Sequence, residues 1–229
     1  MIAREPVLCH RIAAIAASRH NLFMSQEAVR HLSRDPVLQA LIKRIGPPKL
    51  TVEKRSPYEA LVRAISHQQL HGRAAETILG RFIALYPEPF PEPAQVLSTQ
   101  ETVLRGCGFS QSKVVAILDI CAKTLDGTVP NRRAAVKMAD MELIERLMTI
   151  RGVGRWTVEM LLMFTLGRPD ILPVDDFGVR EGYRLLHTLD DQPKPRTLAA
   201  IGEAWAPFRT TAAWYLWRAA DEGKKIKPV

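Results

Sequence analysis

Apolar residues recur at the three- and four-residue spacing of amphipathic helices along most of this 229-residue chain. Between residues 57 and 70, for example, Leu61, Ala64 and Ile65 fall on one helical face. The preceding Ser56 is a favoured helix N-cap, and Pro57 suits the first helical position. No segment alternates apolar and polar residues over the length of a strand. The pattern predicts an all-α fold.

The same spacing predicts further helices, separated by short proline-bearing loops. The expected helices cover residues 6–18, 25–33, 36–45, 72–83, 111–125, 141–149, 156–166, 176–187, 197–204 and 207–220. The expected loops are residues 46–48, 87–93, 127–130 and 190–195. Loops of this length connect packed helices, and the chain is long enough to form one large domain or two small ones.

The charge and the cysteines limit the classes of protein to which the chain can belong. A net charge of +8 favours a polyanionic partner, although many basic proteins bind no nucleic acid. Cys9, Cys107 and Cys121 are odd in number and lack a CxxC spacing, which argues against a disulfide framework and a four-thiolate metal site. The longest apolar run, residues 160–166, is too short to span a bilayer, and the N-terminus has no continuous apolar signal region. We expect a soluble cytoplasmic protein, associated with the nucleoid if the source is bacterial.

The turn Gly152-Val153-Gly154 joins two of the expected helices. Glycines permit a tight turn and the close approach of another backbone, and the N–H groups at the start of the following helix can bind a phosphate. A phosphate contact of this kind holds DNA without reading its sequence. The alternative is a plain turn between two helices that happens to contain two glycines. The preceding Leu147 and Ile150 and the following Arg155 favour the DNA interpretation.

Twenty residues after Trp156 comes Asp176, at the end of the sequence Leu-Pro-Val-Asp-Asp. A carboxylate held at a fixed distance from a phosphate anchor can stabilise positive charge on a sugar and orient or deprotonate a water molecule. Its neighbour Asp175 is expected to cap the helix that follows, because Asp is favoured at an N-cap.

The hairpin and the downstream aspartate together resemble the signature of the helix-hairpin-helix DNA glycosylase superfamily. In that family the hairpin is followed by a loop with Gly and Pro and by an essential Asp, which residues 167–169 and Asp176 match. Residues 58–69 resemble the family's segment that enters the minor groove at the lesion, and residues 205–217 resemble its closing helix. The resemblance covers roughly residues 35–221. It implies two helical domains, with the target nucleotide flipped into an active site in the cleft between them.

Two departures from other members narrow the resemblance. Members that also cleave the DNA backbone carry a Schiff-base Lys where this chain has Trp156, and an indole cannot supply that amine. Members with an iron–sulfur cluster carry four C-terminal cysteines, but this chain has none after Cys121. Both features resemble the monofunctional alkylpurine (3-methyladenine type II) glycosylases. The resemblance implies N-terminal helices over residues 1–51 that pack with a C-terminal lobe of residues 166–229, and a central helical barrel over residues 52–165.

The resemblance also assigns roles at the site. Asp176 is implied as the catalytic carboxylate. Trp156 and Trp217 are implied as aromatic surfaces for a cationic base, because an electron-rich ring attracts a cation. Met160 stands where some relatives carry Tyr, which predicts a softer and less polar wall. The alternative for tryptophans is a place in the helical core, and we expect it for the remaining two, Trp205 and Trp214.

The DNA contacts follow from the same resemblance. Gln69 matches the position of the residue that fills the space left by the flipped nucleotide, and His71 is close enough to assist; both could instead be ordinary polar residues at a helix end. Gln68 could equally be buried and structural. The implied phosphate contacts are Gly152, Val153, Gly154 and Arg155. Relatives often hold a monovalent cation through hairpin carbonyls, which here correspond to Met148, Ile150 and Val153.

We therefore expect an enzyme that hydrolyses the N-glycosidic bond of alkylated purines in double-stranded DNA. It should need no cofactor and no metal for the chemistry, contact no membrane, and act as a monomer. One alternative is a glycosylase for uracil, deaminated or mismatched bases. A second is a non-catalytic DNA-binding protein that uses the hairpin only as an anchor, and a third is a helical scaffold unrelated to DNA.

Overall fold

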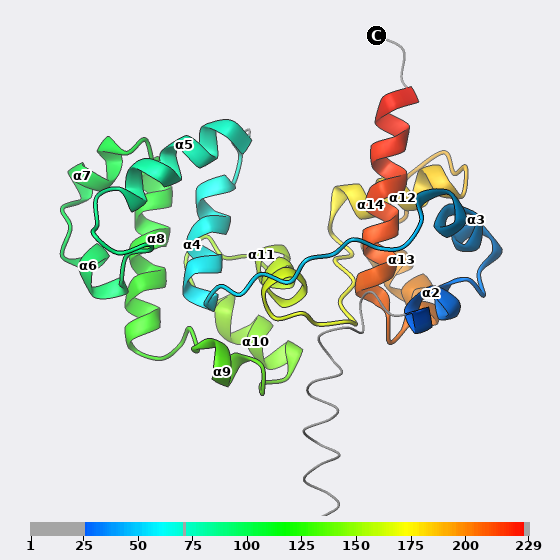
Figure 1. Cartoon of the computed structure of the whole chain (residues 1–229), viewed down its shortest axis with the longest axis horizontal. Helices are drawn as coiled ribbons and strands as arrows, with labels where there is room; N and C mark the ends of the chain where they lie inside the picture. Colours follow the sequence, from blue (N-terminus) through cyan, green and yellow to red (C-terminus); the bar gives the residue numbers. More distant parts are fainter. Residues whose placement is uncertain (1–25, 71, 227–229) are drawn as a thin grey trace, which may run out of the picture. The chain divides into compact units, whose positions relative to one another are not determined.

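The computed structural model describes residues 26–70 and 72–226 (Figure 1). The helix expected at residues 6–18 and His71 lie outside this part. Within it every regular element is helical and there is no strand, so the predicted all-α class is confirmed. No described helix combines the length and the apolar character that crossing a membrane requires.

The chain divides into two compact units. The central unit is Glu53–Leu166, and the terminal unit combines the chain up to Val52 with the chain from Gly167 onward. The central unit contains α4 (Pro57–His67), α5 (Gly72–Ile83), α6 (Pro93–Leu97), α7 (Glu101–Gly106), α8 (Gln111–Leu125), α9 (Arg132–Ala135), α10 (Asp140–Leu147), α11 (Arg155–Met160) and the π-helical turn η2 (Leu161–Thr165). The terminal unit contains α2 (Gln26–Leu32), α3 (Pro36–Ile45), α12 (Phe177–Leu186), α13 (Pro195–Gly202), the 3₁₀ turn η3 (Glu203–Trp205) and α14 (Arg209–Ile226).

Most of the expected helices in the described part are present, and several begin at the predicted residue. The helices expected at residues 36–45, 72–83 and 111–125 match α3, α5 and α8. Three short helices, α6, α7 and α9, were not predicted, because segments of four to six residues are too short to show a helical period. The segment expected as one helix at residues 156–166 begins as α11 and changes to a π-helical turn, in which the Leu166 N–H donates to the Leu161 carbonyl at 3.0 Å.

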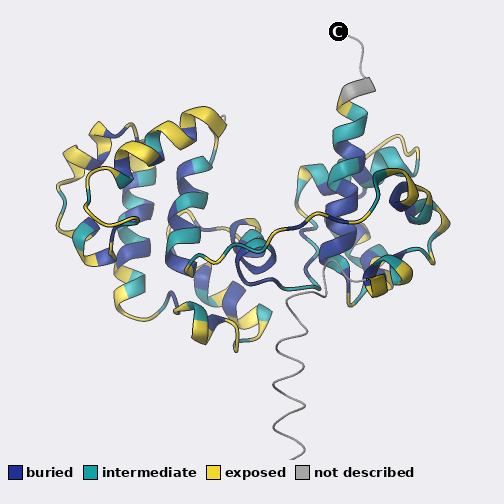
Figure 2. Ribbon diagram, viewed as in Figure 1, coloured by how far each residue is buried: buried dark blue, intermediate teal, exposed yellow. Residues whose placement is uncertain are grey.

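The core of the central unit lies between α4, α5 and α8. Leu61 and Ile65 on α4 and Ile120 on α8 are buried. Figure 2 shows buried stretches along both helices. Cys107 and Cys121 are free and buried, and burial raises the pKa of the Cys121 thiol to about 11. Both thiols therefore contribute to packing as small apolar groups.

The core of the terminal unit depends on the close approach of α12 to α14. A Cβ atom at Gly182 would overlap the backbone carbonyl of Leu216, so the two helices can touch only because position 182 lacks a side chain. The Tyr215 hydroxyl donates to the Gly46 carbonyl at 3.0 Å and ties α14 to the end of α3. Trp205 and Trp214 are buried here, which confirms their predicted place in the core.

Candidate active site

The hairpin connects α10 to α11, and its two glycines have different reasons to be there. Gly152 has φ of 73°, and a Cβ atom on it would lie 3.1 Å from the Cβ of Ala116. Both its conformation and its packing therefore require glycine. Gly154 is the N-cap of α11, with an ordinary φ of −94°, and a Cβ atom there would project into open space. No residue in the described part of the chain requires glycine at position 154.

Two neighbouring helices hold the hairpin turn in place. The Gln68 side chain, at the end of α4, donates to the Gly152 carbonyl at 3.1 Å. The Asp119 carboxylate, on α8, accepts the Arg151 N–H at 2.7 Å. Gln68 makes a structural contact, as one alternative predicted, but it is partly exposed and not buried. These two bonds fix the position of the turn within the central unit.

Gln69 comes directly after Gln68, whose side chain bonds to the hairpin. It is exposed and has φ of 56°, a left-handed conformation that is uncommon for a residue with a side chain. Local strain of this kind persists only where the surrounding structure imposes it, and the bond from Gln68 to Gly152 is one such constraint.

Arg155 is bound by a buried carboxylate. Its Nε donates to Oε1 of Glu159 at 2.9 Å, and Glu159 is only 2% exposed. The guanidinium itself stays partly exposed beside the hairpin. Trp156, the next residue, is 46% exposed, an unusual position for an indole.

Asp176 is the N-cap of α12 in the terminal unit. Its Oδ1 accepts the Val179 N–H at 2.8 Å and the indole N–H of Trp217 at 2.9 Å. The prediction that Asp175 caps this helix is therefore wrong, and Asp175 is exposed instead. The reason is the turn before the helix, in which the Asp176 N–H donates to the Pro173 carbonyl at 3.0 Å and places residue 176 at the cap.

The bond between Asp176 and Trp217 depends on Gly178, a residue that the sequence analysis did not single out. A Cβ atom at Gly178 would lie 2.9 Å from Cδ1 of Trp217 and 3.2 Å from Oδ1 of Asp176. Any side chain here would push the indole away from the carboxylate. The available signal was a glycine in the first turn of a helix, a place where glycine is otherwise unfavourable.

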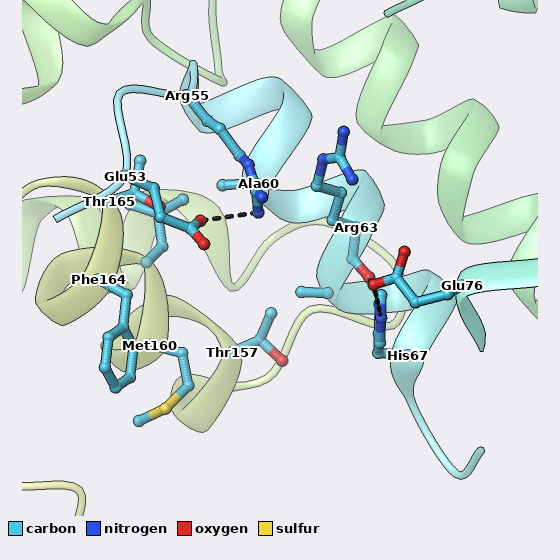
Figure 3. A pocket seen from close by; sticks show the side chains of 12 residues that line it. Glu53, Arg55, Ala60, Arg63, His67, Glu76, Thr157, Met160, Phe164 and Thr165 are labelled. Atoms are coloured by element: carbon cyan, nitrogen blue, oxygen red, sulfur yellow. Dashed lines mark hydrogen bonds and ion pairs between the residues drawn. The ribbon is translucent and has the colours of Figure 1, made fainter. Parts of the chain in front are cut away.

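The central unit also contains a pocket of about 380 Å³ between α4, the segment before it, and α11 with η2 (Figure 3). Met160 and Phe164 project into it from one side, and Arg63 and His67 from α4. Met160 lines this pocket, whereas Trp156 is not among the residues that line it.

The charged residues of this pocket are paired. Arg55 contacts Glu53 at 2.7 Å, and the two nitrogens of the His67 ring lie 2.8 Å from the Arg63 carbonyl and 2.9 Å from a Glu76 oxygen. Both partners of His67 are oxygen atoms that can only accept a hydrogen bond. Sequence reasoning placed Arg63 and His67 only within the segment expected in the minor groove. It missed Glu53, Arg55 and Glu76, which come from two other segments with no common motif.

The helical fold, the hairpin and the capping aspartate together are the features by which a protein family can be assigned. Residues 62–207 match the family model described as HhH-GPD superfamily base excision DNA repair protein, and this range includes both the hairpin and Asp176. The chain belongs to this family, as the sequence resemblance predicted.

Comparison with individual relatives gives more detail than the family model. The chain is 42% identical over 203 residues to DNA-3-methyladenine glycosylase 1 of Schizosaccharomyces pombe, covering 87% of this chain and 89% of that protein. A solved structure of the S. pombe 3-methyladenine DNA glycosylase Mag1 in complex with abasic DNA aligns with a TM-score of 0.76 at 43% identity, over 84% of this chain and 96% of that one. The DNA-3-methyladenine glycosidase of Bacillus halodurans aligns with a TM-score of 0.80 at 32% identity, over 88% and 92% of the two chains.

Proposed function

We propose that the chain is a monofunctional DNA glycosylase that flips alkylated purines out of double-stranded DNA and hydrolyses their N-glycosidic bond. The observation that carries the proposal is the Asp176 carboxylate, which the Val179 N–H and the Trp217 indole hold at the start of α12. A carboxylate that only capped a helix would not need the second donor or the glycine at position 178 that admits it.

In the proposed reaction the bond between the sugar C1′ and the purine N9 breaks, and its electron pair leaves with the base. A purine methylated at N3 or N7 is already cationic, so it departs without prior protonation. Asp176 stabilises the positive charge that develops at C1′ and accepts a proton from the water that attacks there. The two hydrogen bonds to Oδ1 orient the carboxylate before the substrate arrives.

The aromatic and apolar residues have the role of binding the base. Trp156 and Trp217 offer ring faces that favour a cationic base over a neutral one. Met160 supplies an apolar wall in a pocket whose volume is within the roughly 300–1,000 Å³ typical of small-molecule sites. Because position 156 has no amine, no Schiff base forms and strand cleavage does not follow base release.

The hairpin has the role of gripping a phosphate. The N–H groups of Gly152, Gly154 and Arg155 donate to no acceptor in residues 26–70 and 72–226, so they are available for a ligand. The carbonyls of Met148 and Val153 likewise accept nothing from the described residues, and the Ile150 carbonyl accepts the Val153 N–H. A monovalent cation held by these carbonyls would strengthen the attraction of the turn for a phosphate.

Base release from methylated duplex DNA tests the proposal. We expect free 3-methyladenine or 7-methylguanine by chromatography, with intact strands until the abasic sites are cleaved chemically. Binding of DNA without release of any base, from uracil and hypoxanthine substrates as well, would instead support a non-catalytic DNA-binding protein. Release of uracil or hypoxanthine alone would support the alternative substrate class. A scaffold unrelated to DNA would show no salt-sensitive affinity at all.

The phosphate contact of the hairpin can be tested separately. Gly154→Ala should weaken binding to duplex DNA about 10-fold, because the new methyl group occupies the approach to the turn amides and displaces a charge-assisted hydrogen bond. The added Cβ has no described atom within 4 Å, so the unfolding midpoint should change little. Fluorescence anisotropy measures the affinity. Gly106→Ala, in equally open space on α7, is the matched control, and equal affinities for the two variants would exclude the proposed phosphate contact.

A further inference from the structure

The first turn of α12 presents an exposed aromatic residue directly after Asp176. Phe177 is 65% exposed, more than any other large apolar residue in the described part of the chain. Several other aromatic side chains of the terminal unit pack into its interior: Trp205 and Phe208 are 3% exposed and Tyr215 is fully buried. Phe177 therefore does not contribute to the core of this unit.

The same turn carries an arginine, Arg180, for which the described residues supply no partner. The Arg180 side chain makes no ion pair and no hydrogen bond with any residue that the structure describes, although its Nε is shielded from solvent. Two nearby arginines of the terminal unit are paired: Arg184 contacts Glu181 at 2.8 Å and Arg209 contacts Asp170 at 2.7 Å. The guanidinium charge of Arg180 is thus not compensated by any carboxylate in the part of the chain that the structure describes.

Helix geometry places these two residues on one side of α12. Positions three apart lie roughly 60° from one another around the helix axis. The opposite side, with Gly178 and Gly182, packs against α14. Phe177 and Arg180 thus form a small patch, one ring and one cation, on the outward side of the turn that Asp176 caps.

We propose that this patch is a second DNA-contact surface, in addition to the hairpin. Arg180 pairs with a backbone phosphate, and Phe177 packs against a base or deoxyribose of the same strand next to the target nucleotide. A positive charge without a protein partner is complementary to a phosphate, and an aromatic face accepts any base by stacking. The proposal rests on the proposed function, because DNA that brings its sugar to Asp176 must pass the residues that follow Asp176 in the same turn.

Binding to a duplex with a stable abasic-site analogue, measured over a series of salt concentrations, tests this surface. Phe177→Ala should lower the affinity about 10-fold and leave the salt dependence unchanged, because stacking involves no counterion release. Arg180→Gln should reduce the slope of log affinity against log salt by about 0.9, the value for one lost phosphate contact. Matched controls are Leu125→Ala, which truncates a 60% exposed apolar residue of the central unit, and Arg196→Gln, which removes an exposed arginine of α13.

The outcomes separate this surface from the proposed activity. If both variants bind like their controls while the unsubstituted protein releases methylated bases, the surface is excluded and the activity stands. If both variants show the expected losses while the unsubstituted protein releases no base, the surface stands and the activity is excluded. Because Phe177 is mostly exposed, its truncation should leave the unfolding midpoint unchanged. A marked fall would show a packing role and overturn the assignment of Phe177.

Discussion

Asp176→Asn is expected to lower the rate of base release from methylated DNA at least about 100-fold, the effect of losing a general base and a charge beside the reacting sugar. Asparagine caps helices as well as aspartate does, and its carbonyl oxygen can accept the same two hydrogen bonds, from the Val179 N–H and the Trp217 indole. The variant should therefore keep its fold and its affinity for DNA, and lose only the negative charge.

Single-turnover release of 3-methyladenine or 7-methylguanine measures this effect without interference from product release. Asp175→Asn is the matched control, because it removes the same charge from an exposed neighbour that does not cap α12. We expect the control to release base at close to the unsubstituted rate. Equal rates for both variants, with both folded, would exclude Asp176 as the catalytic carboxylate.

Gly182→Ala is expected to destabilise the terminal unit by about 3 kcal/mol or more, at the upper end of the range for overpacked cores. The new Cβ would overlap the Leu216 carbonyl, which is backbone and cannot rotate away, so α12 and α14 must separate. Separation moves Asp176, which caps α12, away from Trp217, which lies on α14. Base release should consequently fall together with stability.

Denaturant unfolding followed by circular dichroism measures the loss of stability. Gly80→Ala is the matched control, since it adds the same methyl group to the exposed interior of helix α5, where nothing lies within 4 Å. Alanine is preferred in a helix, so this control should be stabilised by up to about 1 kcal/mol. Similar unfolding midpoints for the two variants would show that α12 and α14 can accommodate the side chain.

Sequence reasoning located the helices whose ends are set by interactions between residues close together in the chain. Asp35 before Pro36 and Ser110 before Gln111 cap α3 and α8 through bonds to N–H groups two or three residues away, and each helix begins at the predicted residue. The hairpin has the same character, since it combines a short motif with its immediate neighbours. Helices of four to six residues were not predicted, because a capping residue can be recognised only when a periodic apolar segment follows it.

The arrangement around Asp176 shows where local reasoning ends. Two adjacent aspartates have the same cap propensity, and the choice between them depends on the turn at Pro173. The partner of Asp176 is 41 residues away on another helix, and it reaches the carboxylate only because Gly178 has no side chain. No local sequence pattern indicates that two residues so far apart in the chain lie in contact.

The sequence by itself determined the all-α class, the main helices, the hairpin and the family, because periodicity, capping and short motifs act within a few residues. Only the tertiary structure decided that Asp176 caps α12, that Trp217 binds it, that Gly182 admits α14, and that Phe177 and Arg180 lie outside the core. These features depend on which helices touch and how closely, and that is set by packing between residues far apart in the chain.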